Sequence, residues 1–173
     1  MKKYYLIIIT IVCIVFTSCN NNETVTRFPQ QTINGYEYID LGLSVKWAAY
    51  NYGAQSHEEE GLNLTYSEAL KAAKLWGKAW RVPTKDDFQE LINFCTWKWT
   101  KQNNIKGYKV TGPNGNSIFI PVKNKKYENY WGNSICYDGM VDALMVSANS
   151  NYGMSCGFTK EHNDQKRVRF VTP

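Results

Sequence analysis

The chain has 173 residues, of which 43% are hydrophobic and 14% aromatic, and its formal net charge at pH 7 is +5. This length fits one domain of ordinary size with room for a hydrophobic core. The charge is too small to indicate nucleic-acid binding, which usually goes with a strongly basic domain. We therefore expect no nucleic-acid partner.

The N-terminus has the features of a bacterial export signal. Lys2 and Lys3 precede an almost unbroken apolar run over residues 4–17. The run has the length of a signal-peptide core and is shorter than the roughly 20 apolar residues that a transmembrane helix needs. It ends in the sequence FTSC at residues 16–19, which resembles the lipobox of bacterial lipoproteins. In that family the cysteine, here Cys19, is lipidated and the signal is cut off before it.

We predict a signal peptide over residues 1–18, a lipidated Cys19 with a polar tether over residues 19–34, and one domain over residues 35–173. Without the signal, the chain has 18 basic and 15 acidic residues and a charge of +3. The expected location is the bacterial cell envelope, at the outer membrane, with the lipid on Cys19 as the membrane contact. The periplasmic and surface orientations both stay open. The alternatives are an ordinary secretory signal with Cys19 as a bystander and an uncleaved anchor.

Two helices are expected in the first half of the domain, after strands at residues 36–42 and 45–48. Thr65 and Glu68 fit a capping box, in which each side chain binds a free backbone N–H of the other residue. Thr84, after Pro83, starts the second helix. The predicted buried stripes are Ala69, Ala72, Ala73 and Trp76 in the first helix, and Phe88, Leu91, Ile92 and Cys95 in the second.

The second half reads as antiparallel strands. Residues 108–111 and 117–120 flank a turn at 112–116 and predict a hairpin. Further strands are expected at residues 130–134, 141–148, 153–158 and 167–171. Strands first, helices next and an antiparallel set last predict an α+β fold.

Three cysteines remain after the signal and the anchor, namely Cys95, Cys136 and Cys156. They allow one intramolecular disulfide in an oxidising compartment. Cys136 and Cys156 both fall in strand-like segments of the C-terminal half, so they are the predicted pair. Cys95 lies on the apolar helix face and is interpreted as a buried free thiol.

The domain resembles the FISUMP family, the major paralogous domains first named from Fibrobacter. The resemblance spans residues 36–171, and its blocks occur in the family's order. The blocks are YIDLGL at 38–43, VKWA at 45–48, NYGA at 51–54, WRVPTKDDFQEL at 80–91, CTWKW at 95–99, GYKVT at 107–111, NSIFIP at 116–121, YWGNS at 130–134 and the weaker VRFV at 168–171.

The resemblance implies a C-type-lectin-like fold, in which ligands usually meet loops among the C-terminal strands. The candidate ligand-binding residues in these stretches are Tyr137, Asp138, Asn149, Asn151, Tyr152, His162 and Asp164. Amide and aromatic side chains suit sugar hydroxyls, sugar faces or protein partners. The chain departs from the family at residues 55–64, which are shortened, at Phe88, where Trp is frequent, and at Gly132-Asn133, which replaces a serine pair.

Other site chemistries fit the sequence less well. The formylglycine-generating enzymes, which are similar in fold, use paired cysteines, but the residues around Cys136 and Cys156 do not match their motif. Lectin-type calcium sites need carboxylates that are missing after Pro113-Asn114 and Trp131. The acidic run after His57 is interpreted as a solvated loop. The Trp97-Lys98-Trp99 alternation is interpreted as a strand with buried tryptophans and outward lysines.

From these features we predict a non-enzymatic envelope lipoprotein that binds a glycan or a protein, with no cofactor and no metal. One alternative is a structural or assembly subunit of an envelope complex. A second is a degenerate or unrecognised enzyme related to the formylglycine-generating enzymes.

Overall fold

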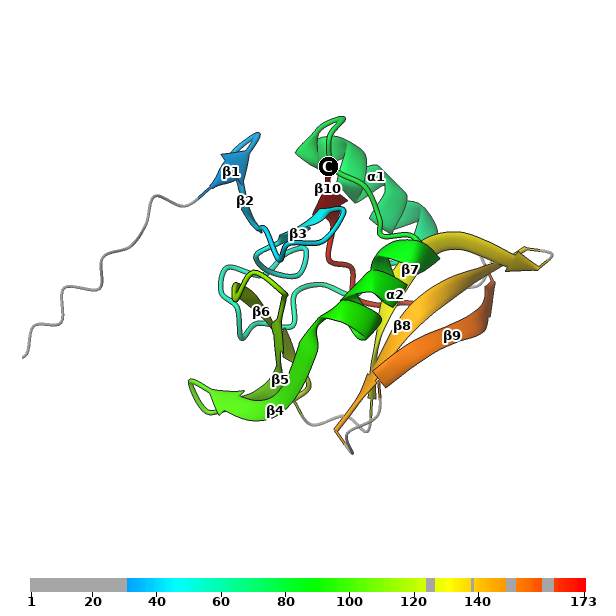
Figure 1. The fold of residues 1–173 in the computed structure, drawn as a ribbon. Helices are drawn as coiled ribbons and strands as arrows, with labels where there is room; N and C mark the ends of the chain where they lie inside the picture. Colours follow the sequence, from blue (N-terminus) through cyan, green and yellow to red (C-terminus); the bar gives the residue numbers. More distant parts are fainter. Residues whose placement is uncertain (1–30, 124–126, 138, 149–151, 160–163) are drawn as a thin grey trace, which may run out of the picture.

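The computed structural model describes residues 31–123, 127–137, 139–148, 152–159 and 164–173, without the side chains of 156–159. Two helices and mostly antiparallel strands make the fold α+β, as the order of the predicted elements indicates (Figure 1). In chain order the elements are β1 (Thr32–Ile33), β2 (Tyr36–Ile39), β3 (Lys46–Ala48), α1 (Tyr66–Trp76), α2 (Lys85–Phe94), β4 (Thr96–Gln102), β5 (Ile105–Thr111), β6 (Ser117–Pro121), β7 (Tyr127–Tyr137), β8 (Met140–Ser147), β9 (Tyr152–Thr159) and β10 (Val171–Thr172).

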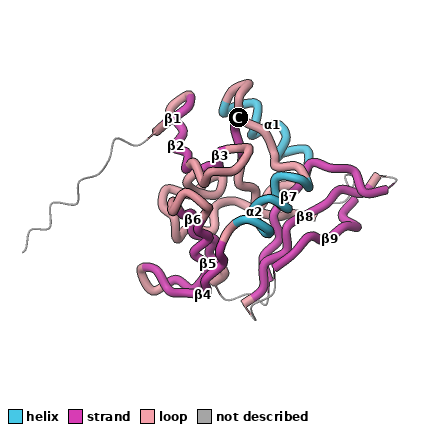
Figure 2. The backbone as a smooth tube through the Cα atoms, in the orientation of Figure 1, coloured by secondary structure: helices cyan, strands magenta, loops and turns pink. Residues whose placement is uncertain are grey.

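The strands form three sheets, ordered β1-β2-β3-β10, β4-β5-β6 and β7-β8-β9. The last two are meanders whose strands follow one another in sequence, whereas the first brings the last strand beside the third. Figure 2 shows the helices running between the sheet of the C-terminal half and the strands of the N-terminal half. The predicted hairpin is confirmed, because β5 and β6 pair antiparallel around a turn closed by the Gly112 N–H to the Asn116 carbonyl.

Both helices begin where the capping signals predict. The Thr65 hydroxyl accepts from the Glu68 N–H, and the Glu68 carboxylate accepts from the Thr65 N–H at 2.8 Å. Thr84 and Asp87 repeat this arrangement at α2. The predicted stripe of α1 is buried throughout. In α2, Phe88 and Leu91 are buried, while Ile92 and Cys95 are half-buried against the same core.

Two hydrophobic clusters hold these parts together. One lies where α2 contacts the sheet β7-β8-β9 and the sheet β4-β5-β6, and it includes Trp47, Phe88, Tyr108 and Leu144. The other lies under α1 and contains Trp76, Trp80, Trp131 and Phe170. Trp131 is fully buried, as expected of a core residue. Burying such large aromatic surfaces is the main contribution to the stability of a domain of this size.

Residues 166–172, which we call the C-terminal segment, run through the middle of the fold. Its backbone bridges to Leu64, Tyr130 and Arg81, and β10 pairs with β3. All its residues are buried, including Arg167 and Arg169. Only Val171–Thr172 forms a strand, so the strand predicted over 167–171 is wrong in extent. The segment is held by single bridges to several partners and not by one ladder.

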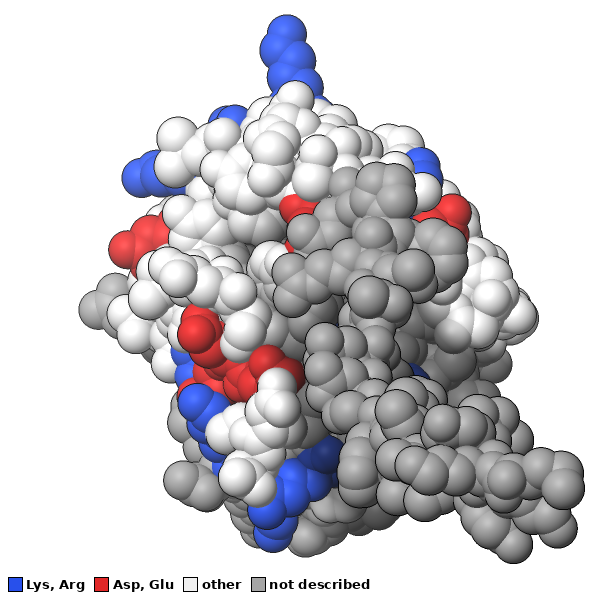
Figure 3. Space-filling model, turned by 90° about the vertical axis from the view of Figure 1, so that its left-hand side faces the viewer, with Lys and Arg blue, Asp and Glu red and all other residues white. Residues whose placement is uncertain are grey.

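The loop at residues 51–64 is less solvated than its acidic run indicates. Glu60 forms an ion pair with Arg167 at 2.7 Å. Glu58 accepts hydrogen bonds from Gln102 and Asn103, at the tip of the β4–β5 hairpin. On the face shown in Figure 3, acidic and basic side chains form separate patches next to one another.

The chain joins the fold earlier than the tether boundary at residue 34 indicates, because β1 pairs with β2. The predicted signal and Cys19 lie outside the described residues. Among the described helices, none is long and apolar enough to span a bilayer. The alternation at residues 97–99 is confirmed, since Trp97 and Trp99 are half-buried on β4 and Lys98 is exposed. Lys101 is exposed as well, although it lies on the same face of the strand as the two tryptophans.

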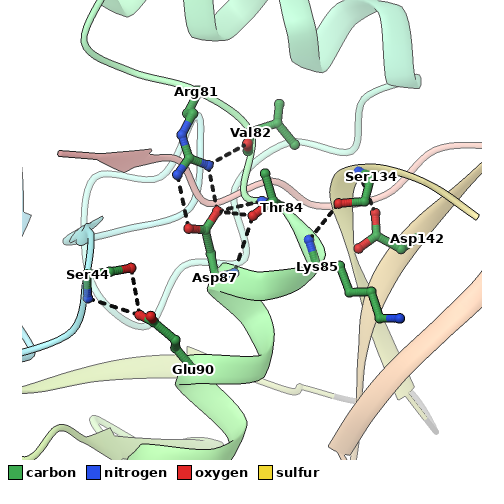
Figure 4. Close-up of polar contacts among 9 residues, drawn as sticks. All are labelled: Ser44, Arg81, Val82, Thr84, Lys85, Asp87, Glu90, Ser134 and Asp142. Atoms are coloured by element: carbon green, nitrogen blue, oxygen red, sulfur yellow. Dashed lines mark hydrogen bonds and ion pairs between the residues drawn. The ribbon is translucent and has the colours of Figure 1, made fainter.

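The start of α2 yields a first prediction. The Asp87 carboxylate accepts from Arg81 at 2.5 and 3.0 Å and from the Thr84 N–H at 2.6 Å (Figure 4). Burial alone would raise the pKa of Asp87, but the bonds from Arg81 and Thr84 outweigh it and hold this pKa below its ordinary value. A lowered pKa stabilises the fold above the unfolded-state value of about 3.9, and this contribution is lost as the pH falls.

We therefore expect Asp87→Asn to lower the free energy of unfolding by about 1–3 kcal/mol at pH 7. The difference between the two proteins shrinks as the pH falls below about 4. The wild-type carboxyl then takes up a proton, first in the unfolded chain and at lower pH in the folded protein. Urea denaturation followed by tryptophan fluorescence at several pH values measures this. Asp86→Asn, exposed in the same helical turn, is the control. A deficit that does not change with pH contradicts the prediction.

Candidate functional site

Of the seven candidate residues in the C-terminal half, the structure describes Tyr137, Tyr152 and Asp164. Asp138, Asn149, Asn151 and His162 lie outside the described residues. Tyr137 ends β7 beside Met140, whereas Tyr152 begins β9 beside Val146. Met140 and Val146 are six positions apart on β8, a distance of about 20 Å at the rise of a strand. The two tyrosines therefore lie at opposite ends of the sheet and cannot contact one small ligand.

Tyr152 has a packing role. Its ring stacks on Trp97 with centroids 4.1 Å apart and meets Tyr108 edge-on. Tyr152 is half-buried by these contacts, and its role in ligand binding stays a prediction. Asp164 is exposed and lies 3.7 Å from the ammonium of Lys166, which in turn covers the Trp131 ring at 4.3 Å. This arrangement orients Lys166 over the core.

Among the predicted disulfide residues, Cys136 is disulfide-bonded. The side chain of Cys156 lies outside the described part, so its pairing with Cys136 stays a prediction. Cys95 is a free thiol, as predicted. Burial raises the pKa of Cys95 to about 11, with a further contribution from Glu90. The thiol is therefore kept protonated, and its reactivity is low.

A bulge in β7 builds the most distinctive polar feature of this half. Trp131 pairs with Ala143 and Ile135 pairs with Val141, so three residues of β7 lie opposite the single Asp142. The bulge turns the Ser134 N–H toward the Asp142 carboxylate, whose Oδ1 it binds at 2.9 Å. Bulges re-aim side chains in this way, and they recur next to binding and active sites.

Gly132 makes room for this carboxylate. A Cβ atom at residue 132 would lie 2.3 Å from the Asp142 Oδ1. Any other residue would therefore push the Asp142 carboxylate away. Gly132 and the buried acidic side chain therefore depend on each other.

Asp142 itself is buried, with 2% of its surface exposed. Its Oδ2 atom has no hydrogen-bond partner among the described residues. Burial raises the pKa of Asp142, and the hydrogen bond from Ser134 and the charge of Lys85 only partly offset this. A buried acceptor without a partner costs free energy, and such atoms are rare in folded proteins. Asp142 is one of seven described residues with a buried side-chain N or O atom that lacks such a partner, and it is the one of them that lines the pocket described below.

The first turn of α2 closes one side of this position (Figure 4). The Lys85 N–H donates to the Ser134 hydroxyl oxygen at 2.8 Å, and the Asn133 N–H donates to the Pro83 carbonyl at 2.7 Å. In Figure 4 the Asp142 carboxylate lies between Ser134 and the side chain of Lys85. In the described structure the Lys85 ammonium has no carboxylate within ion-pair distance. Lys85 and Asp142 therefore offer one unpaired charge of each sign.

These groups line a pocket of about 390 Å³, which we call the Asp142 pocket. The volume lies within the range of small-ligand sites. Its lining is Lys85, Ser134, Ile135, Cys136, Tyr137, Asp142, Met154 and Ser155. Ile135 and Tyr137 are 66% and 63% exposed, which is high for such residues on a strand. The pocket thus has a polar side formed by Asp142, Ser134 and Lys85 and an apolar rim.

A second cavity, of about 560 Å³, lies near the first strands and is lined by Tyr36, Tyr50, Tyr52 and Trp76 among others. Several of its lining residues already contact one another, because Tyr50 donates to Glu37 and the Tyr36 ring stacks on Trp76.

Within the described residues no cluster of three or more His, Cys, Asp or Glu side chains could hold a metal. His57 contacts the Ala49 carbonyl at 3.2 Å.

Two residues that line the Asp142 pocket were predicted from the sequence, Tyr137 as a ligand-binding residue and Cys136 as a disulfide residue. The missed signal is Asp142, which is the one charged residue in the otherwise apolar strand β8. Comparison with known protein families, with curated proteins and with solved structures finds no match for this chain.

Asp142 yields a second prediction. The pKa of Asp142 is higher in the folded protein than in the unfolded chain, where it is about 3.9. Ionisation of Asp142 therefore lowers the free energy of unfolding above this pH, and the full effect is reached above the folded-state pKa. We expect Asp142→Asn to raise the free energy of unfolding by about 1 kcal/mol at pH 7, and to have little effect below pH of about 3. Urea titrations at both pH values test this. Asp87→Asn is the comparison, since it is expected to lower the free energy of unfolding at pH 7. An Asp142→Asn protein that is less stable than the wild type would contradict the prediction.

Proposed function

We propose that the chain is a lipoprotein of the bacterial cell envelope, anchored through Cys19. The support is the order of charged, apolar and FTSC segments over residues 1–19. The fold begins at Thr32, which leaves a short connection between the proposed lipid and the domain. The outer membrane is the proposed location.

We further propose that the domain is a FISUMP domain with a C-type-lectin-like fold. The blocks that carry the resemblance fall on structural features. The block at 80–91 contains the Arg81–Asp87 ion pair, and the block at 130–134 is the bulged part of β7. The block at 168–171 lies in the buried C-terminal segment. Each block thus has a packing or capping reason to occur where it does.

The function that the geometry supports best is non-enzymatic glycan binding in the Asp142 pocket. The observation that carries it is the buried Asp142 Oδ2, an acceptor without a partner among the described residues, in a pocket that Lys85 and Ser134 also line. A sugar hydroxyl can donate to a carboxylate while it accepts from an ammonium, so neighbouring hydroxyls fit this pair. The exposed Tyr137 offers a ring face for the apolar side of a pyranose.

A protein partner is the second candidate, and the apolar rim is the observation that favours it. Ile135 and Tyr137 are both more than 60% exposed on one strand. Aromatic side chains beside a pocket are frequent anchors of protein interfaces. In this reading the rim binds an apolar side chain of the partner, and Asp142 accepts a backbone or side-chain donor.

The lipid anchor makes a third prediction. We expect Cys19→Ser to abolish incorporation of radiolabelled palmitate and to move the protein out of the membrane fraction, because one residue carries the buried acyl chains. Cell fractionation with palmitate labelling measures both. Cys95→Ser, which removes a cysteine of the domain, is the control and should keep the label. Labelling that survives Cys19→Ser would exclude the proposed anchor.

Glycan binding makes a fourth prediction. The chain from residue 19 onward with Cys19→Ser is applied to a glycan array with and without EDTA. We expect binding that EDTA leaves unchanged, that falls at least about tenfold in Asp142→Asn, and that weakens in Tyr137→Ala. Tyr127→Ala is the control, since Tyr127 is 50% exposed on the same strand but at its other end.

Because Asp142→Asn is expected to be more stable than the wild type, loss of binding in this variant cannot come from unfolding. Binding that both variants leave intact would place the glycan elsewhere. An array without binding would move the proposal to a protein partner, sought by crosslinking on intact cells with Tyr137→Ala as the negative control.

A further inference from the structure

The β4–β5 hairpin is a basic surface element. Lys98 and Lys101 on β4, and Lys106 and Lys109 on β5, are all exposed. Figure 1 shows the hairpin extending from the body of the domain, with its tip away from both helices. In the part of the chain that the structure describes, none of these four lysines forms an ion pair.

The register of the hairpin places the lysines opposite one another. Lys98 pairs directly with Lys109, and Lys101 pairs directly with Lys106. Like charges at directly opposite positions destabilise a strand pair. The hairpin does not need them, since Trp97, Trp99 and Tyr108 hold it to the core. Alternate residues of a strand point to opposite faces, so Lys98 and Lys109 lie on one face of the hairpin and Lys101 and Lys106 on the other. Two unfavourable pairs thus give the hairpin positive charge on both faces, which suits an anionic partner that contacts its edge and tip.

A fifth lysine adds to this surface. Lys123 is exposed and follows Val122, whose N–H donates to the Lys106 carbonyl at 2.9 Å. The nearest described carboxylate at the tip is Glu58, and it accepts hydrogen bonds from Gln102 and Asn103. In Figure 3 the basic side chains at the lower end of the molecule are separate from the acidic patch above them.

The hairpin lies on the same side of the domain as the start of the described chain. In Figure 1 both β1 and the β4–β5 tip lie on the left, and Figure 3 looks onto this side. Twelve peptide units separate Cys19 from Gln31, and even fully extended they span no more than about 43 Å. A lipid on Cys19 would therefore keep the start of the described chain within about this distance of the bilayer.

We propose that the β4–β5 hairpin binds the phosphates of anionic phospholipid headgroups and so lays this side of the domain against the membrane. This orientation rests on the lipid anchor proposed above. Lysine is suited to the task because its ammonium is a mobile point charge that needs no fixed partner geometry. Each lysine close to an anionic membrane surface contributes about a fivefold gain in affinity, and tethering raises the local concentration of headgroups.

The test uses the chain from residue 19 with Cys19→Ser, so that no lipid is present. Sedimentation with vesicles of phosphatidylcholine alone, or with one third phosphatidylglycerol, measures the partition coefficient. We expect binding to the anionic vesicles only, and loss of this binding as salt is raised. The variant with Lys98→Gln, Lys101→Gln and Lys109→Gln should partition at least about tenfold less.

The matched control carries Lys71→Gln, Lys74→Gln and Lys78→Gln, three exposed lysines in α1 and just after it, with the same change in net charge. The hairpin variant loses like-charge repulsion and is expected to stay folded, which its unfolding temperature checks. Equal binding to both vesicle types, or equal loss in the two variants, would overturn the proposal. So would binding to a soluble polyanion but not to vesicles, which would identify an acidic polymer as the partner. Since the vesicle assay contains no acylated protein, failure of the anchor and failure of the hairpin are distinguishable.

Discussion

The rest of the structure depends on the burial of the C-terminal segment. Arg169 is 2% exposed and donates to the Asn51 side chain and to the Phe119 carbonyl, both at 2.9 Å. Burial lowers the pKa of Arg169 to about 10. A buried guanidinium without such partners would be strongly destabilising, so the loop at 51–64 and strand β6 must hold their acceptors in place. Arg167 likewise donates hydrogen bonds to the Glu60 carboxylate and to the Gly61 carbonyl.

The Asp142 pocket follows from this arrangement. The C-terminal segment bridges to Tyr130, and the Trp131 N–H donates to the Arg167 carbonyl. The first half of β7 is therefore fixed to the core, and the extra residues of the bulge protrude where α2 begins. The bulge, Gly132 and the start of α2 together enclose a carboxylate that packing alone would exclude. A buried carboxylate whose pKa is raised and which lines a pocket is a candidate for a binding role.

Local signals predicted most of the elements. Four residues suffice to recognise a capping box, so Thr65 and Thr84 located both helices, and the turn at 112–116 located a hairpin. Long-range pairs are not encoded locally. Glu60 and Arg167 are 107 positions apart, so the ion pair that draws the acidic loop onto the domain could not be derived from nearby residues. The grouping of the strands into three sheets could not be derived in this way either. The site was missed for a related reason. Polar residues in predicted loops were the candidates for a site, whereas Asp142 is a single acidic residue within the mostly apolar strand β8.

The position of the C-terminal segment also affects when the domain can form. A polypeptide leaves the ribosome N-terminus first, and here the residues that fill the middle of the core appear after the other elements of the domain. Until residues 166–172 arrive, β3 is paired on one side only, with β2, and the loop at 51–64 lacks its basic partners. The contacts that complete the fold are thus of high sequence separation, which slows folding. Under the export proposed above, this delay would be useful, because premature compaction blocks the translocation of an extended chain.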